Sequence, residues 1–149
     1  MKNRIFLAIA LLLLLLLSPL PAWAANPRHV IELQTSNRCQ LCDLTGAYLP
    51  VSKLDYTYIL ASDLSKANLV GASITFSNLS RANLSGANLS YVNFKHTKLL
   101  LTNFTNAIFD NTNLTEADLT SATISEAQLA KAKLCKTVLP TGLTSNRDC

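Results

Sequence analysis

The sequence has few of the residues on which catalysis usually depends, and it lacks any concentration of charge. Its only histidines are His29 and His96, which lie far apart in the chain. Lysine and arginine number 13 against 9 aspartates and glutamates, a net charge of +4, and these charges are scattered. Because nucleic-acid binding needs a concentrated basic face, we expect no nucleic-acid partner. We also expect no enzymatic activity, no cofactor and no metal site.

No apolar run is long enough for a permanent membrane anchor, which needs about 20 residues. The longest run, Ile5–Leu17, has thirteen residues and follows Lys2 and Arg4. Prolines come after the run, and small residues occupy the −3 and −1 positions of a cleavage site that ends at Ala24. This order is typical of a signal peptide, so residues 1–24 are predicted to be removed on export. The next residue is alanine, so no cysteine can accept a lipid there, and we expect no membrane attachment after cleavage.

Most of the remaining chain repeats with a period of five residues. Twenty large apolar residues occupy successive fifth positions, and the residue two before each of them is small, from Cys42 to Thr137. The twenty large residues are Leu44, Leu49, Leu54, Ile59, Leu64, Leu69, Ile74, Leu79, Leu84, Leu89, Phe94, Leu99, Phe104, Phe109, Leu114, Leu119, Ile124, Leu129, Leu134 and Leu139.

A period of five fits neither an α-helix nor a straight strand. Five residues rotate by about 500° on a helix, so the leucines would spiral around it. On a straight strand, an odd period would send alternate leucines to opposite faces. The pattern is satisfied if the chain bends the same way after each pentad, so that each large residue and its small partner point to one axis. The sequence therefore predicts one domain of stacked coils over residues 42–139, with caps over residues 25–41 and 140–149.

The segment Ser80–Leu89 is close to the A-(D/N)-L-x-x consensus, and the chain resembles the pentapeptide-repeat proteins over residues 42–139. This resemblance implies an all-β fold. It implies a right-handed quadrilateral β-helix with four pentads per coil, and hence about five coils. Asn26 and Pro27 are typical of a helix start, so we also expect a short N-terminal helical cap.

The sequences at the two ends of the repeat resemble one particular group within this family. The segments Asn26–Val30, Cys39–Leu44 and Leu134–Cys149 are similar to the caps of exported cyanobacterial pentapeptide-repeat proteins. This likeness implies the periplasm or the thylakoid lumen as the location. It implies no settled biochemical activity.

Four cysteines lie in two close pairs, one at each end of the mature chain. An even number of cysteines in an exported protein favours disulfides. Because the rod holds its two ends apart, the predicted bridges are Cys39–Cys42 and Cys135–Cys149. The C-x-x-C spacing of Cys39 and Cys42 leaves open a thiol–disulfide redox role, although a structural bridge is the favoured interpretation.

Alignment of the sequence at intervals of twenty residues places aromatic side chains on the outer surface. Tyr56, Phe76 and His96 would form one outward column. An exposed aromatic and aliphatic patch with a basic edge is a candidate surface for a protein partner, although ordinary packing between coils is the favoured interpretation. The residues that map to the adjoining face are Tyr58, Leu60, Arg81, Leu100 and Leu101.

The functional hypothesis from the sequence is a non-catalytic exported rod, a monomer or weak dimer, that acts as a protein-interaction or structural module. One alternative is a redox role through Cys39 and Cys42. Another is DNA mimicry, since some pentapeptide-repeat proteins imitate DNA and bind topoisomerase. Mimicry needs a strongly acidic surface and a cytoplasmic location, and the charge balance and the predicted signal peptide argue against it.

Overall fold

The computed structural model describes residues 25–149, so the signal peptide expected over residues 1–24 lies outside the described residues. Its regular elements are α2 (Pro27–Ser36), α3 (Glu126–Lys131), β1 (Thr137–Val138) and β2 (Thr144–Ser145). Strands β1 and β2 pair in antiparallel fashion near the C-terminus. Within residues 25–149, no helix is both long enough and apolar enough to cross a membrane.

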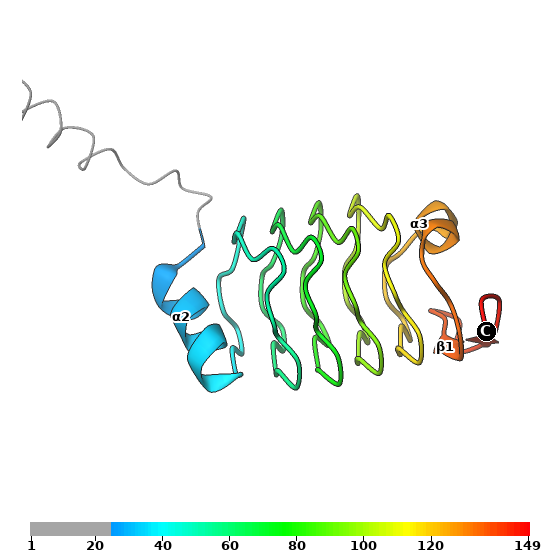
Figure 1. Cartoon of the computed structure of the whole chain (residues 1–149), viewed down its shortest axis with the longest axis horizontal. Coiled ribbons are helices and arrows are strands. Elements are labelled where there is room, and N and C mark those ends of the chain that lie inside the picture. The colour runs from blue at the N-terminus through cyan, green and yellow to red at the C-terminus, as the bar shows by residue number, and fades with distance from the viewer. Residues whose placement is uncertain (1–24) are drawn as a thin grey trace, which may run out of the picture.

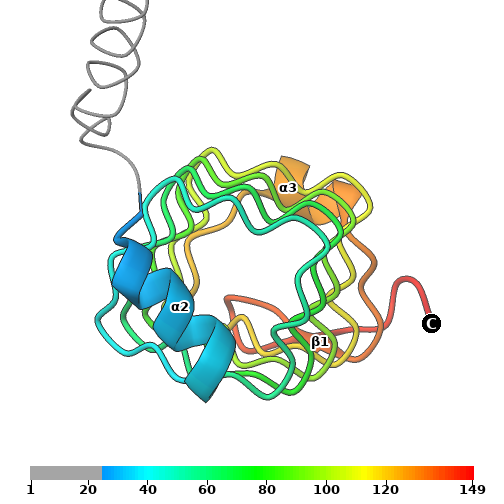
Figure 2. The ribbon, with the colours of Figure 1, turned by 60° about the vertical axis from the view of Figure 1, so that its left-hand side comes forward.

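Between the two helices, the chain winds into coils that stack side by side (Figure 1). Parallel bridges join residues twenty apart along the chain, beginning with Arg38 and Tyr58. Backbone hydrogen bonds connect neighbouring coils at these bridges: the Leu84 amide, for example, donates to the Asn103 carbonyl over 2.8 Å. Twenty residues are four pentads, so each coil has four walls, and the coils superpose around one axis (Figure 2). The expected quadrilateral arrangement is therefore present.

The large and small residues of each pentad fill the interior of the rod. Every predicted large residue from Leu44 to Leu119 is buried, and three phenylalanines are the bulkiest of them. Most of the small inward residues that carry a hydroxyl donate to a carbonyl of the preceding coil, as Thr97 does to Ile74 over 2.6 Å, whereas Thr57 donates to Leu54 of its own coil over 2.8 Å. Serine and threonine can therefore occupy the interior without leaving a buried polar group unpaired.

The corners of each coil determine which side chains point outward. From Leu44 to Leu119, the second residue after each large one lies in the left-handed region, with φ of 54° at Phe76 and 57° at His96. The residue before each large one is often Asn or Asp, and its side chain closes the corner: Asn83 Oδ1 accepts a hydrogen bond from the Ser85 amide over 3.2 Å. This local bond explains the preference for Asn and Asp at that position.

Helix α2 lies across the first coil and covers its open edge (Figures 1 and 2). The Asn26 side chain accepts a hydrogen bond from the Arg28 amide over 3.0 Å, and Pro27 occupies the first turn. Leu33 is fully buried against the coils, and Asn37 ends the helix in the left-handed conformation. The helix thus shields a backbone edge to which another strand could otherwise pair.

The repeat is interrupted near its C-terminal end, where the expectation of twenty uninterrupted pentads in one β-helix is wrong. Helix α3 replaces one wall of the last coil, so Ala127 is exposed rather than inward. A capping box between Ser125 and Gln128 favours this helix. The Gln128 side chain compensates for the missing wall, because its Nε2 donates to the carbonyls of Phe104 and Ala107 over 2.8 Å each.

Candidate interaction surface and the two disulfides

Three of the predicted surface residues form a stacked column on the outside of the rod. The ring centroids of Tyr56 and Phe76 lie 5.3 Å apart with planes inclined by 6°, and those of Phe76 and His96 lie 4.5 Å apart at 18°. Each ring occupies a corner of its coil, so the spacing of the coils sets the spacing of the rings. Tyr56 is 64% exposed and Phe76 is 51% exposed. The next residue in the column, Glu116, pairs with His96 across 3.1 Å.

This stacking covers one face of Tyr56 and leaves the ring edges of the column in solvent. Phe76 is stacked on both sides, between Tyr56 and His96. A sugar or a nucleobase that binds by stacking needs a free aromatic face. At Phe76 the column therefore offers only ring edges, an apolar ridge suited to contact with protein side chains.

The wall beside the column carries the other predicted surface residues. Tyr58 and Leu101 are each 53% exposed, and Arg81 is exposed. Leu60 and Leu100 are half-buried between them. The structure thus brings all the predicted surface residues to one side of the rod, where apolar area and positive charge adjoin.

Two shallow hollows adjoin Tyr58 on this wall. Their volumes are about 280 Å³ and about 150 Å³. The larger is lined by Arg38, Gln40, Tyr58 and Leu60. The smaller is lined by Tyr58, Phe76, Ser77, Asn78, His96 and Lys98.

The hollows add Arg38 and Lys98 to the surface, two cations that the sequence analysis missed. Both belong to the column of Tyr58, because all three residues are separated by multiples of twenty. The interval of twenty that revealed the aromatic column could therefore have revealed them as well. We call the combined surface the aromatic–basic face; it consists of Arg38, Tyr56, Tyr58, Leu60, Phe76, Arg81, His96, Lys98, Leu100 and Leu101.

Among residues 25–149, the arginines and the lysine of the aromatic–basic face form no ion pair. The Arg38 guanidinium lies 5.7 Å from the centroid of the Tyr58 ring, in cation–π range. Among residues 25–149, no carboxylate lies within ion-pair distance of Arg38, Arg81 or Lys98. The face therefore presents positive charge beside exposed apolar rings.

The opposite wall carries a second group of exposed apolar residues that the sequence analysis also missed. Tyr48 is 77% exposed and Tyr91 is 64% exposed. Asp110 on this wall pairs with Lys131 of α3 across 2.9 Å. Lys66, an exposed lysine with no ion pair among the described residues, comes two residues before Asn68, which bridges to Tyr48. This wall therefore has exposed aromatic rings but lacks the column of Arg38, Tyr58 and Lys98, which makes it a control for the aromatic–basic face.

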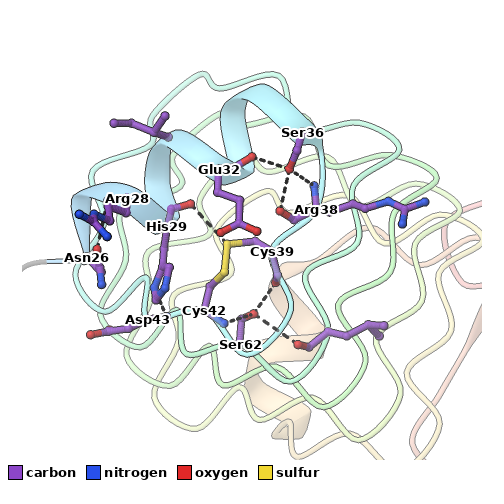
Figure 3. Close-up of a disulfide and its surroundings, with 12 residues drawn as sticks. Asn26, Arg28, His29, Glu32, Ser36, Arg38, Cys39, Cys42, Asp43 and Ser62 are labelled. Atoms are coloured by element: carbon purple, nitrogen blue, oxygen red, sulfur yellow. Dashed lines mark hydrogen bonds between the residues drawn. A yellow bond between two sulfur atoms is a disulfide. The ribbon is translucent and has the colours of Figure 1, made fainter.

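At the N-terminal end, Cys39 and Cys42 form a disulfide with Cα atoms 5.5 Å apart (Figure 3). Cys39 is fully buried and Cys42 is 4% exposed beneath α2. Potential ligand atoms of Glu32 and the two cysteines lie within 4.8 Å of one another. Because the two sulfurs are bonded to each other, neither is available as a thiolate ligand for a metal.

The surroundings of this disulfide are unlike those of a reactive thiol. Cys39 comes after the C-terminal end of α2, whereas reactive thiols are activated at helix N-termini. The nearby Glu32 carboxylate opposes the formation of a second negative charge on sulfur. Burial also blocks the approach of an attacking thiolate. The bridge is suited to fixing the connection between α2 and the first coil.

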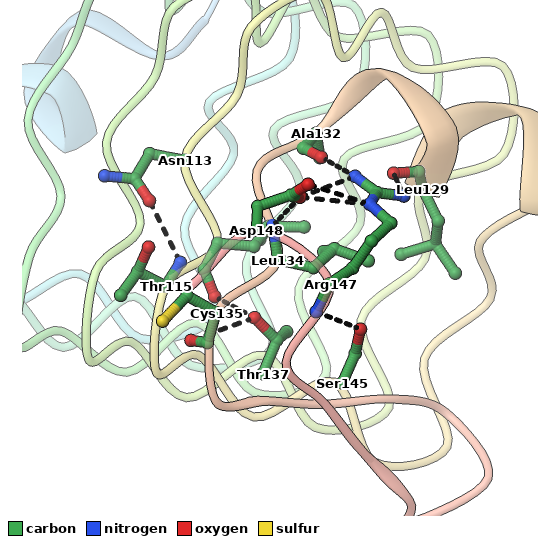
Figure 4. Close-up of polar contacts among 11 residues, drawn as sticks. Asn113, Thr115, Leu129, Ala132, Leu134, Cys135, Thr137, Ser145, Arg147 and Asp148 are labelled. Carbon is green, nitrogen blue, oxygen red and sulfur yellow. Dashed lines mark hydrogen bonds and ion pairs between the residues drawn. The ribbon is translucent and has the colours of Figure 1, made fainter.

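At the C-terminal end, Cys135 and Cys149 form the second disulfide, with Cα atoms 4.7 Å apart. The preceding residues bind the tail to the last coil (Figure 4). Arg147 donates to the carbonyls of Leu129 and Ala132, and Asp148 accepts a hydrogen bond from the amide of Leu134 over 2.7 Å. Hydrogen bonds from Arg147 and from this amide lower the pKa of Asp148. The tail is thus held by polar contacts as well as by the disulfide.

Comparison with protein families matches the chain to the pentapeptide repeats. Eight copies of the repeat are found, over residues 67–99 and 101–134. No curated protein has a significantly similar sequence.

Several similar solved structures are also pentapeptide-repeat proteins. One, from the cyanobacterium Cyanothece, is 22% identical, covers 81% of this chain and 95% of that chain, and has a TM-score of 0.46. HetL from the cyanobacterium Nostoc, which is involved in the regulation of heterocyst differentiation, is 25% identical over 72% of this chain and 51% of its own, with a TM-score of 0.37. A third, from the thylakoid lumen of Arabidopsis thaliana, is 25% identical over 76% of this chain and 87% of its own, with a TM-score of 0.27.

Proposed function

Because the chain belongs to the pentapeptide-repeat family, whose members are generally non-enzymatic modules, we propose that it is a non-catalytic rod that binds a protein partner. The rod has about five coils, and the partner binds to the aromatic–basic face. The observation that carries the proposal is the stacked column of Tyr56, Phe76 and His96, with apolar ring edges held in solvent beside unpaired cations. Contiguous apolar surface with a polar rim is typical of a docking site.

The rigidity of the scaffold supports this role. The outward side chains project from coils whose backbone groups already bond to neighbouring coils, so the face exists before a partner arrives. A preformed surface loses little conformational entropy on binding. Tyrosine and arginine are also the residue types that most often contribute strongly to binding at protein interfaces.

We place the working protein outside the cytoplasm, in the periplasm or the thylakoid lumen. Two features support this location: the signal-like residues 1–24 and the two disulfides. Disulfides persist in oxidising compartments and are rare in the cytosol.

The redox alternative receives less support from the surroundings of its cysteines. Cys39 and Cys42 are buried, and the Glu32 carboxylate disfavours a thiolate beside it. A redox enzyme would need this bridge to be reduced at a mild potential. DNA mimicry is disfavoured as well, because the chain has a net positive charge rather than an acidic surface.

The experiment that tests the proposal is affinity capture from the compartment in which the protein resides. The tagged mature protein is compared with Tyr58→Ser/Phe76→Ser and with the control Tyr48→Ser/Tyr91→Ser, which changes exposed aromatics on the opposite wall. We expect one protein to be retained by the wild type and by the control variant and lost with Tyr58→Ser/Phe76→Ser. Equal capture by all three forms, or no specific capture by any of them, would contradict the proposal. Thermal melts check that the variants remain folded.

A further inference from the structure

We propose that the aromatic–basic face binds an extended acidic polypeptide segment that lies along the rod axis, with two carboxylates four residues apart and an apolar residue midway between them. This inference rests on the proposed function and specifies the chemistry of the partner. The observations that support it are the positions of Arg38, Arg81 and Lys98 and of the two hollows beside Tyr58.

The charge of the face selects an anionic partner. Arg38, Arg81 and Lys98 lie on three different coils, and none has a carboxylate within ion-pair distance among the described residues. Acidic groups adjoin the face: Asp55 directly precedes Tyr56, Glu116 pairs with His96, and Asp118 follows Lys98 in the same column, where it accepts hydrogen bonds from Thr120. A second copy of the chain docked through the same face would bring like charges together, which disfavours self-association there.

The spacing of two cations fixes the spacing of the carboxylates. Arg38 and Lys98 belong to one column and are three coils apart. At ~4.8 Å per coil, this separation is about 14 Å. An extended chain rises by about 3.4 Å per residue, so four residues span the same distance. Residues i and i+4 also point to the same side of an extended chain, so both carboxylates can face the rod.

The surface between Arg38 and Lys98 explains why we expect an apolar residue between the two carboxylates of the segment. Tyr58 and Asn78 occupy the intermediate positions of the column, and both line the smaller hollow, which extends to Lys98. Residue i+2 of the segment points to the same side as residues i and i+4, and it would meet this hollow midway along the column. An apolar side chain at i+2 can therefore contact the exposed ring edges.

The backbone of this wall cannot pair with an added strand. The Tyr58 amide donates to the Asn37 carbonyl, and the Asn78 amide donates to the Thr57 carbonyl, over 2.9 Å each. The Lys98 amide is bonded in the same way to the preceding coil. Recognition must therefore come from side chains, and its electrostatic part should weaken as salt is added.

The test is an NMR titration of the ¹⁵N-labelled mature protein with synthetic peptides. The probe is Gly-Glu-Thr-Leu-Thr-Glu-Gly. One comparison peptide has Gln in place of both Glu residues, and the other has its two Glu residues two positions apart instead of four. We expect the probe to shift amide signals in the columns of Tyr58 and Phe76. Both comparison peptides should bind at least about threefold more weakly.

Protein variants locate the binding site on the rod. Arg38→Gln and Lys98→Gln should each lower the affinity for the probe peptide about threefold, as expected for the loss of one exposed ion pair. The double variant should lower it about tenfold. The control Lys53→Gln/Lys66→Gln removes two exposed cations on other parts of the rod and should change the affinity by less than about twofold. The inference is overturned if the probe does not bind, if the Gln peptide binds as well, or if the control variant loses as much affinity.

A single-stranded oligonucleotide is titrated in parallel. Tighter binding of the oligonucleotide at the same amides would replace the acidic polypeptide with nucleic acid as the ligand. Failure of the peptides is distinguishable from failure of the proposed function: if affinity capture still gives a partner that is lost with Tyr58→Ser/Phe76→Ser, the face binds a protein and only the acidic-segment inference is wrong.

Discussion

At the residue scale, one step along the chain separates the interior from the surface. Leu84 is fully buried at the centre of its pentad, whereas Ser85 lies on the outer side. Leu84→Asp should unfold the rod or separate its coils, because it buries a carboxylate without a partner. Ser85→Asp should change the free energy of unfolding by no more than about 0.5 kcal/mol. Thermal melts that show equal effects for the two substitutions would mean that the inward positions are wrongly assigned.

A single carboxylate on the outer surface is expected to couple stability to pH. Burial alone would raise the pKa of Asp55, but hydrogen bonds to its Oδ1 from the Ser73 hydroxyl, the Thr75 hydroxyl and the Thr75 amide, each 2.7 Å long, outweigh burial and hold the pKa below its ordinary value of 3.8. Since the pKa is lower in the folded state than in the unfolded state, the ionised group stabilises the rod above about pH 4. That stabilisation is lost as the pH falls through the folded-state pKa.

The variant Asp55→Asn removes this titration while retaining a side-chain oxygen that can accept hydrogen bonds. Denaturant melts should show Asp55→Asn to be less stable than the wild type near neutral pH, and the difference should narrow below about pH 4. A difference that stays constant between pH 7 and pH 2 would show that the ionised carboxylate does not contribute.

At the scale of elements, helix α3 depends on one side chain that has two roles. Gln128 completes the capping box with Ser125, and its amide bonds the carbonyls of Phe104 and Ala107 where a wall is missing. Gln128→Ala should therefore lower the free energy of unfolding by about 1–3 kcal/mol. The control Gln34→Ala, on the exposed side of α2, makes the same change without either role and should cost less than about 0.5 kcal/mol. Equal costs would mean that Gln128 does not replace the missing wall.

The sequence predicted the coils well because each pentad repeats one local rule. A large inward residue, a small inward partner and an outward Asn or Asp specify the same bend at every step. The repeat pattern did not predict helix α3, because Ala127 and Leu129 fit the pattern. The capping residues Ser125 and Gln128 nevertheless favour a helix. The pentad pattern constrains which residues point inward, but it does not exclude a helix that buries the same leucine.

The candidate surface was only partly predictable for a related reason. Alignment at twenty residues identified Tyr56, Phe76 and His96 because aromatic residues are few. Arg38 was attributed to the N-terminal cap, yet the structure bridges it to Tyr58 as part of the first coil. The N-terminal boundary of the coils depends on where α2 ends, and the repeat pattern begins only at Cys42.

At the scale of the whole molecule, the disulfides secure the two ends of the rod. The Cys135–Cys149 bridge closes a loop of fifteen residues, so Cys135→Ser/Cys149→Ser should lower the free energy of unfolding by about 3 kcal/mol in the chain-entropy model. The Cys39–Cys42 loop is shorter and should contribute less. In hydrogen exchange, the variant should lose protection over residues 134–149 before the amide of Leu84 is affected. Peptide mapping of the non-reduced protein that found a Cys42–Cys135 linkage would contradict this account.

The central claim for the whole molecule is that one side of the rod meets a partner. It is tested most directly by photocrosslinking in cells that produce the protein, with p-benzoylphenylalanine in place of Tyr58 or, on the opposite wall, of Tyr48. Both side chains are exposed, so a reactive group at either position can reach a molecule that docks there. We expect a discrete crosslinked adduct from position 58 and none from position 48. An adduct from position 48 alone, or equal adducts from both positions, would show that the aromatic–basic face is not the interaction surface.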